Sequence, residues 1–159
     1  MVSSSSKLDL QHSTAHGTSG FSQREHARTV PTVLLADDHI ELLQAVARML
    51  EGKFEVVATA KDGRRALELA HNLSPDVLLL DISMPVMNGI EAALHLKEEG
   101  SSAKVVFLTV HDDRDFVEAA MSAGALGYIL KQRLAADLIL GLKTVLDGDT
   151  FVSSSTILQ

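Results

Sequence analysis

The sequence contains no cysteine and no tryptophan, and it has a single tyrosine among its 159 residues. The absence of cysteine excludes disulfides, zinc sites built on thiolates and cysteine nucleophiles. The chain also lacks an apolar run long enough to span a membrane, and its first residues do not resemble a signal peptide. We therefore expect a cytoplasmic protein that makes no contact with a membrane.

An excess of positive charge is also missing. The formal net charge is −7, and because residues 1–30 carry +1, the rest of the chain carries −8. Proteins that bind nucleic acid usually present a basic surface, since much of their affinity comes from phosphate contacts. We therefore expect no direct contact between this chain and nucleic acid.

The composition of the chain changes near residue 30. Residues 1–30 are rich in serine and have no apolar period, which predicts a flexible Ser-rich N-terminal tail. Residues 31–148 alternate apolar runs with helical patterns and predict one folded domain. We expect residues 149–159 to form a linker-like C-terminal tail, with no effector domain present.

Five apolar runs in the predicted domain alternate with five helical patterns. Five such strand–helix units imply a parallel sheet with helices on both faces. The predicted fold class is α/β, a flavodoxin-like three-layer α/β/α arrangement with a five-stranded parallel sheet of order 2-1-3-4-5. The predicted strands are residues 32–36, 54–59, 77–80, 104–108 and 126–130.

Carboxylates follow two of these strands. Asp37 and Asp38 come directly after the first strand, and Asp81 follows the third. The two strands are neighbours in the predicted order, so the three carboxylates should converge at the edge where such folds bind ligands. Two carboxylates 4 Å apart repel by ~4 kcal/mol at an effective dielectric constant of about 20. A raised pKa on one acid, or a bound divalent cation such as Mg²⁺, would offset this repulsion.

Two further polar residues stand at strand ends. Thr109 stands directly after the fourth predicted strand, and Lys131 follows the fifth. A hydroxyl, an ammonium and Mg²⁺ around one carboxylate would match the three non-bridging oxygens of a phosphoryl group. Asp81 would then be the nucleophile that forms an aspartyl-phosphate. Each of these residues also has a purely structural interpretation. Asp81 could be a helix cap, Thr109 a cap at a strand end, and Lys131 a surface charge. We expect His39, next to the acid pair, to be an early residue of the first helix.

Residues 31–150 resemble the response-regulator receiver (CheY-like) domain of bacterial two-component systems. The matching motifs are Leu-Leu-Ala-Asp37-Asp38-His, Asp81-Ile-Ser-Met-Pro85-Val-Met-Asn-Gly89, Phe-Leu-Thr109 and Gly-Tyr128-Ile-Leu-Lys131. The resemblance implies that a sensor histidine kinase or a phosphotransfer protein phosphorylates Asp81. It also implies a Mg²⁺ ion held by Asp38, Asp81 and the backbone carbonyl of Ser83, with Asp37 acting mainly through water.

The resemblance further implies roles for residues around the phosphoacceptor. Thr109 and Lys131 would contact the phosphoryl group. Thr109 and Tyr128 would form a switch in which the tyrosine ring turns inward. This movement would repack the face made by the fourth helix, the fifth strand and the fifth helix. The alternative is that Tyr128 is an aromatic residue that only packs in the core. Ser83, Val110 and His111 occupy positions that tune phosphoryl lifetime and access to the site, and the bulk of Val110 would narrow that access.

The sub-type resembles the NarL/FixJ group, whose receivers normally precede a DNA-binding domain. The similarity lies in Asp37-Asp38-His39, in Thr109-Val110-His111 and in the C-terminal residues 146–153. We expect the chain to be a switch in a phosphorelay. A homodimer is one expected partner state, and the only reactions we expect are the chain's own phosphorylation and dephosphorylation. The alternatives are a degenerate receiver that acts as a docking module, and a phosphatase-like hydrolase. The hydrolase would need a second acid at position 83, where this chain has serine.

Overall fold

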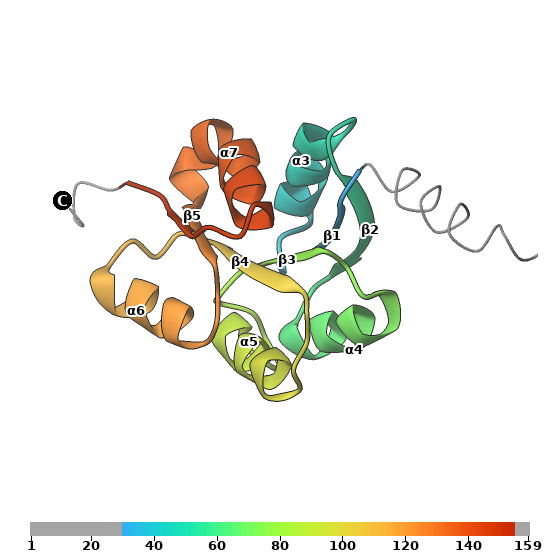
Figure 1. Cartoon of the computed structure of the whole chain (residues 1–159), viewed down its shortest axis with the longest axis vertical. Helices are drawn as coiled ribbons and strands as arrows, with labels where there is room; N and C mark the ends of the chain where they lie inside the picture. Colours follow the sequence, from blue (N-terminus) through green and yellow to red (C-terminus); the bar gives the residue numbers. More distant parts are fainter. Residues whose placement is uncertain (1–29, 155–159) are drawn as a thin grey trace, which may run out of the picture. The chain divides into compact units, whose positions relative to one another are not determined.

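The computed structural model describes residues 30–154, and these form a parallel sheet covered by helices on both faces (Figure 1). The six strands lie in the order β2-β1-β3-β4-β5-β6. The strands are β1 (Thr32–Ala36), β2 (Glu55–Ala60), β3 (Val77–Leu80), β4 (Lys104–Thr109), β5 (Gly127–Leu130) and β6 (Phe151–Val152). The helices are α3 (Ile40–Leu50), α4 (Gly63–Leu73), α5 (Gly89–Glu98), α6 (Arg114–Ser122) and α7 (Leu134–Leu146), with a short 3₁₀ turn η1 (Lys131–Arg133) before α7.

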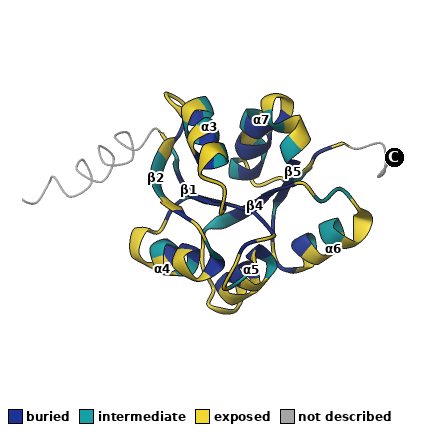
Figure 2. Ribbon diagram, turned by 180° about the vertical axis from the view of Figure 1, so that it is seen from behind, coloured by how far each residue is buried: buried dark blue, intermediate teal, exposed yellow. Residues whose placement is uncertain are grey.

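The central strands are apolar on both faces because both faces are covered. Along β1, Val33 and Leu35 pack into one core with α3 and α7, whereas Leu34 and Ala36 pack into a second core with α4, α5 and α6. The alternation follows from the two-residue period of a strand. Figure 2 shows the result: the central strands β1, β3, β4 and β5 are almost entirely buried, the edge strand β2 is partly exposed, and the helices expose their outer sides. None of the helices formed by residues 30–154 has the length and apolarity needed to cross a membrane.

Short polar side chains fix where three of the helices begin. Asp62 accepts a hydrogen bond from the backbone N–H of Arg65 at the start of α4, and Asp113 does the same for Phe116 at the start of α6. Asn88 and Glu91 form a reciprocal capping box at the start of α5. These caps satisfy N–H groups that a helix leaves unpaired, so the loops before α4, α5 and α6 each end at a defined residue.

The sheet has six strands, so the prediction of five was wrong by one. After α7 the chain returns beside β5, where Phe151 pairs with Gly127 and Val152 with Tyr128 in parallel register. The backbone N–H of Phe151 donates to the carbonyl of Leu126 at 2.9 Å. The pattern did not reveal this strand because two apolar residues between polar neighbours carry no recognisable period. The order of the other five strands is as predicted.

The predicted tails are largely outside the described part of the chain. The structure describes only Val30 of the predicted N-terminal tail, and it does not extend to residues 155–159 at the C-terminus. Residues 151–152 of the predicted linker form β6.

Two glycines hold the loop between β3 and α5 close to its surroundings. A Cβ atom at Gly89 would lie 2.1 Å from the carbonyl oxygen of Asp81, and one at Gly63 would lie 2.3 Å from that of Met87. Neither close approach is open to a residue with a side chain. Within the loop, Val86 has a φ of 71°, and the N–H of Met87 donates to the carbonyl of Pro85 at 2.7 Å. The loop that follows Asp81 is therefore tightly constrained.

Candidate functional site

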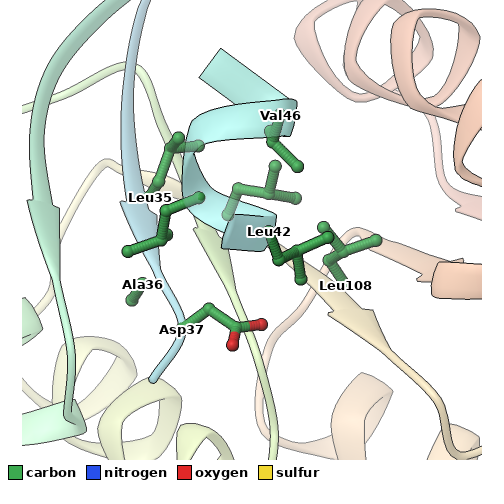
Figure 3. Close-up of a pocket in the computed structure, with 8 residues that line it drawn as sticks. Leu35, Ala36, Asp37, Leu42, Val46 and Leu108 are labelled. Atoms are coloured by element: carbon green, nitrogen blue, oxygen red, sulfur yellow. The ribbon is translucent and has the colours of Figure 1, made fainter. Parts of the chain in front are cut away.

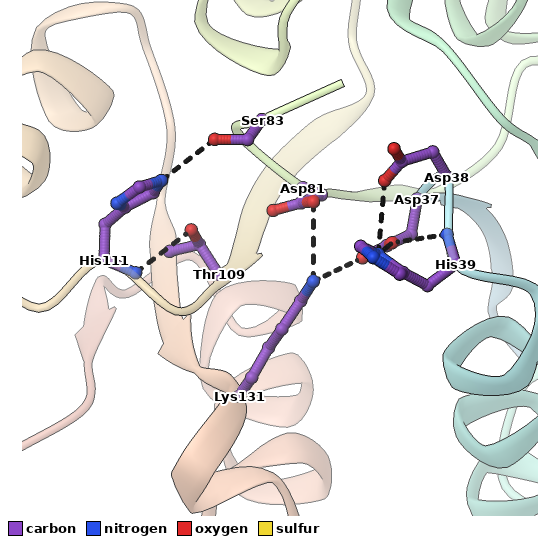
Figure 4. Close-up of polar contacts among 8 residues, drawn as sticks. All are labelled: Asp37, Asp38, His39, Asp81, Ser83, Thr109, His111 and Lys131. Carbon is purple, nitrogen blue, oxygen red and sulfur yellow. Dashed lines mark hydrogen bonds and ion pairs between the residues drawn. The ribbon is translucent and has the colours of Figure 1, made fainter. Parts of the chain in front are cut away.

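The predicted site residues gather at the carboxyl edge of the sheet (Figure 4). Asp37 follows β1, Asp81 follows β3, Thr109 ends β4 and Lys131 follows β5. Backbone hydrogen bonds hold the first two in register with their neighbours, since the N–H of Asp81 donates to Ala36 and the N–H of Asp37 to Ala60. The parallel pairing of β1, β3, β4 and β5 thus brings four residues distant in sequence to one place.

Lys131 links the two buried carboxylates. Its Nζ atom lies 2.7 Å from Oδ2 of Asp37 and 3.4 Å from Oδ2 of Asp81. Figure 4 shows the lysine side chain reaching up from the end of β5 to a point between the two acids. Asp37 and Asp81 are only 3% and 4% exposed, so little water screens their charges. One ammonium thus faces two carboxylates in a poorly solvated place, and Asp38 adds a third nearby.

The charge imbalance appears in the acidity of Asp81. Burial raises the pKa of its carboxyl group, and the nearby charge of Asp37 raises it further, whereas Lys131 acts in the opposite direction. The positive charge of Lys131 thus compensates the negative charge of Asp81 only in part. A cation bound nearby would reduce this excess of negative charge. Conversion of the carboxylate into an ester-like derivative would also reduce it.

His39 is part of this charged cluster. It precedes the first residue of α3, close to the predicted position, and its ring faces the carboxylates. Nδ1 lies 3.0 Å from Oδ1 of Asp37 and 3.2 Å from Oδ1 of Asp38, and the hydrogen bond to Asp37 is the main cause of its raised pKa. In the sequence, His39 directly follows Asp37 and Asp38, and this adjacency was the sign that it could contact them. The helical pattern, which placed His39 at the start of a helix, did not indicate the contact.

The loop after β4 closes the other side of the site. The backbone N–H of His111 donates to Oγ1 of Thr109 at 3.3 Å, and its ring Nε2 lies 2.9 Å from Oγ of Ser83 in the loop after Asp81. The ring also stacks on Phe116, with the centroids 4.1 Å apart. Val110 stands beside this contact with 59% of its surface exposed. Ser83 and His111, which were both predicted to tune the lifetime of the phosphoryl group, are thus in direct contact.

Tyr128 is fully buried in β5. Its hydroxyl group donates to the backbone carbonyl of His111 at 2.5 Å. Burial is the main cause of a raised pKa, so the phenol stays protonated and remains a donor. The inward position that we expected to follow phosphorylation is therefore the position that this structure describes.

A small apolar pocket lies beside Asp37, between α3 and the sheet (Figure 3). Leu42, Val46 and Leu108 are among its lining residues, and Asp37 is the only ionisable one. Its volume of about 10 Å³ accommodates a single water at most, so it is no ligand site. Its effect is electrostatic, because apolar walls beside Asp37 limit the solvation of that carboxylate.

The acidic cluster after β1 fits a hard divalent cation. Ligand atoms of Asp37, Asp38 and His39 lie within 4.8 Å of one another, and Asp38 is the most exposed of the three acids. Carboxylate oxygens with access to water are the ligands that Mg²⁺ prefers, because this ion keeps several of its waters. Asp81 is outside this group of three, but its carboxylate lies at the same edge of the sheet, where its raised pKa also favours a nearby cation.

Comparison with known proteins identifies the family. Residues 33–143, more than half of the chain, match the response regulator receiver domain. The chain belongs to the response regulator receiver family. Its relatives include the transcriptional regulatory protein DegU of Brevibacillus brevis, 40% identical over 122 residues that cover 76% of this chain and 52% of DegU. The nitrate/nitrite response regulator protein NarL of Escherichia coli K12 is 36% identical over 126 residues, which cover 78% of this chain and 58% of NarL.

Solved receiver structures have the same fold. The signal receiver domain of NarL from Mycobacterium tuberculosis superposes with a TM-score of 0.71 at 32% identity, covering 75% of this chain and 98% of that domain. A LuxR-family two-component response regulator from Aurantimonas sp. SI85-9A1 gives 0.76 at 30% identity, covering 82% and 94%. This chain therefore contains the receiver domain of a NarL/LuxR-type two-component response regulator, and it spans slightly more than half the length of the curated relatives it matches.

The receiver domain should become more stable when Asp81 loses its charge. Because the folded-state pKa is raised above the unfolded value near 3.8, stability is lost as the pH rises from that value through the folded-state pKa, and the ionised carboxylate destabilises the fold at all higher pH. In Asp81→Asn the ammonium of Lys131 keeps its shorter contact, with Asp37. We expect this variant to be more stable at pH 7 by about 1 kcal/mol, which raises the melting temperature by about 3–6 °C.

The measurement is thermal unfolding in chelator at pH 7 and again below about pH 3, which lies well under the unfolded-state pKa. At the lower pH the advantage of Asp81→Asn should disappear, because both states of the wild type are then protonated. Asp149→Asn, at an exposed position, is the control and should change stability by less than about 0.5 kcal/mol. A melting temperature of Asp81→Asn at or below that of the wild type at pH 7 would contradict the electrostatic argument.

Proposed function

We propose that Asp81 is the phosphoacceptor of this receiver domain and that its phosphorylation switches a response regulator. The single observation that carries the proposal is the position of Asp81, a buried carboxylate with a raised pKa within ion-pair distance of Lys131. Thr109 and the Asp37–Asp38 pair lie at the same edge of the sheet. The family membership supports this assignment, since phosphorylation-based signalling is consistent with the relatives.

The chemistry follows from the groups at this edge. A carboxylate oxygen of Asp81 attacks the phosphorus atom of a phosphohistidine, the new O–P bond forms, and the N–P bond to the imidazole breaks. Such a transfer needs positioning and charge neutralisation more than covalent help from the protein. Lys131 Nζ, which already contacts Asp81, would pair with one phosphoryl oxygen, and the Thr109 hydroxyl would donate to another.

Mg²⁺ completes this proposal. Asp38, Asp81 and the backbone carbonyl of Ser83 would hold the ion, and Asp37 would act mainly through water. When bound, the ion neutralises the charge that builds up on the transferred phosphoryl group. Asp37 has a second partner in Lys131, which suits a less direct role for its carboxylate.

The proposal makes this chain a switch and not an enzyme that turns over a separate substrate. Its only reactions would be its own phosphorylation and dephosphorylation. An Asp-nucleophile phosphatase would need a general acid near position 83, and the Ser83 hydroxyl instead contacts His111. The degenerate docking module is the weaker alternative, because Asp37, Asp81 and Lys131 remain in ion-pair contact.

The switch would act through Thr109 and Tyr128. The hydroxyl of Thr109 now accepts from the N–H of His111, whose carbonyl in turn accepts from Tyr128. A phosphoryl oxygen that recruits the threonine hydroxyl would therefore disturb the loop to which Tyr128 is bonded. The readout would be the face formed by α6, β5 and α7, because Tyr128 belongs to β5.

The partners in this proposal are a sensor histidine kinase, or a phosphotransfer protein, and a second copy of the chain. Leu140 on α7 and Val152 on β6 are large apolar residues that are exposed on elements bordering β5. The relatives are transcriptional regulators of about twice the matched length, so a DNA-binding output domain that phosphorylation controls is part of the proposal. The acidic receiver itself would not touch nucleic acid.

Phosphorylation can be tested directly with the purified chain. We expect Mg²⁺ and acetyl phosphate to add one phosphoryl group, detected by intact mass, because the carboxylate of Asp81 is the nucleophile. The modification should be absent in Asp81→Asn and in the presence of chelator, and it should persist in the control Asp149→Asn. A modified Asp81→Asn variant would reject the nucleophile, and an unmodified wild type that also fails to bind beryllofluoride would favour the docking module. Binding of beryllofluoride without phosphorylation would instead point to restricted access at Val110, which Val110→Ala should relieve.

The contact between Ser83 and His111 should control how long the phosphoryl group survives. We expect Ser83→Ala and His111→Ala each to shorten the half-life of the aspartyl-phosphate about fivefold, the effect of one lost hydrogen bond of about 1 kcal/mol, because water reaches the site more easily. The double variant should lose no more than either single one, since both remove the same contact. Thermal unfolding checks that the fold is intact, and the exposed His95→Ala is the control. Unchanged lifetimes in both single variants would reject the role.

Dimerisation can be measured on the same material. We expect light scattering after gel filtration to show a monomer that becomes a dimer with Mg²⁺ and beryllofluoride. Leu140→Ser should weaken the dimer, because it removes an exposed apolar side chain from α7. Leu94→Ser, at an exposed apolar position on α5, should not. A monomer under both conditions would remove the homodimer from the proposal.

A further inference from the structure

A second buried polar cluster lies outside the proposed phosphorylation site, where β6 meets β5 and α7. Ser153 is 2% exposed and makes three hydrogen bonds. Its hydroxyl donates to Oδ2 of Asp137 at 2.7 Å and accepts from the N–H of Leu130 at 3.0 Å. Its own N–H donates to the carbonyl of Tyr128 at 2.8 Å. One serine after β6 is thus bonded to two residues of β5 and to α7.

Asp137 is held from its other side by Arg133. The guanidinium Nε lies 2.9 Å from Oδ2 of Asp137, and Nη2 lies 3.3 Å from Oδ1. This pair is the main cause of the lowered pKa of Asp137, and the hydrogen bond from Ser153 contributes in the same direction. Asp137 is 5% exposed, so its charge depends on these partners.

The cluster reaches the proposed phosphorylation site through a single turn of the chain. The 3₁₀ turn η1 begins with Lys131, whose ammonium contacts Asp37 and Asp81, and ends with Arg133, which contacts Asp137. Leu130, which precedes the turn, donates its N–H to Ser153. Both ends of this short segment are thus fixed, one by the carboxylates of the site and the other by the buried cluster.

Detachment of β6 would break this arrangement at several points. The N–H of Leu130 would lose its acceptor, and Asp137 would lose the donor that Ser153 provides. Buried groups without partners are costly, so the end of β5 would rearrange to find new ones. Such a rearrangement would shift the residue that follows, which is Lys131.

We propose that Ser153 and Asp137 are positioning residues that hold the end of β5, and with it Lys131, so that phosphoryl binding at Asp81 and attachment of β6 stabilise each other. This inference rests on the proposed function of Asp81. It makes β6 a responsive element, through which the site communicates with whatever follows residue 154. The coupling is reciprocal, because a ligand that favours the attached strand binds more weakly when the strand is loosened.

The first test uses the unaltered chain. Amide hydrogen exchange is followed by NMR with Mg²⁺, before and after addition of beryllofluoride, and ¹⁹F signals report binding of the analogue. We expect the N–H groups of Leu130 and Ser153 to exchange at least about threefold more slowly with the analogue bound. Bound analogue with unchanged exchange at both positions overturns the coupling. Absence of any bound analogue would instead reject the proposed function of Asp81.

The second test measures the reciprocal effect. Ser153→Ala should bind beryllofluoride about fivefold more weakly or worse, which is the lower end of typical coupling between sites. Ser154→Ala, the same change at the exposed neighbouring residue, should stay within about twofold of the wild type. Circular dichroism and thermal unfolding establish that each variant is folded.

The conclusion does not depend on the folding of one variant. If Ser153→Ala is unfolded, Arg133→Ala takes its place, because the Arg133 side chain is 43% exposed and its loss removes only the outer partner of Asp137. This variant should show a smaller loss of affinity in the same direction. A folded Ser153→Ala, or in its place a folded Arg133→Ala, that binds beryllofluoride as tightly as the wild type overturns the proposal.

Discussion

The site depends on one ion-pair arrangement, in which the ammonium of Lys131 lies between the buried carboxylates of Asp37 and Asp81. Two buried carboxylates at one edge of a sheet would repel each other strongly without a cation. The lysine makes the arrangement stable, but it leaves Asp81 undercompensated, as the raised pKa of that carboxyl group shows. The fold therefore tolerates an excess of negative charge at the position where the proposed chemistry needs a nucleophile and a cation.

Much of the surrounding structure serves to hold these charges in place. The parallel strands set the positions of the two acids and the lysine, and the two loops that flank Asp81 are fixed by contacts of their own. In one loop Gly89 allows the chain to approach the carbonyl of Asp81 closely, and in the other the ring of His111 stacks on Phe116. The Ser83–His111 contact then joins the two loops.

The strand ends could be predicted from the sequence, but the contacts between loops could not. The apolar run of residues 77–80 followed by Asp81 determined both a buried strand and the place of its acid. By contrast, the hydrogen bond from Tyr128 to the carbonyl of His111 depends on the backbone path of a loop, which no side-chain pattern records. The strand β6 was missed for a related reason, because its two residues are too few to show a period and Ser153 holds it through a tertiary contact.

The buried position of Tyr128 changes how a switch in this receiver should be understood. A ligand shifts a conformational equilibrium only by its different affinity for the two states. With the tyrosine ring already inside and bonded to His111, little of any phosphorylation response can come from moving that ring inward. Under the proposed phosphorylation of Asp81, the response would then lie in elements bonded to the same groups. Ser153 is one of these, since its N–H donates to the carbonyl of Tyr128 while its hydroxyl accepts from Leu130. On this argument the edge of the sheet at β5 and β6, more than the ring itself, is where a change at Asp81 would be expressed.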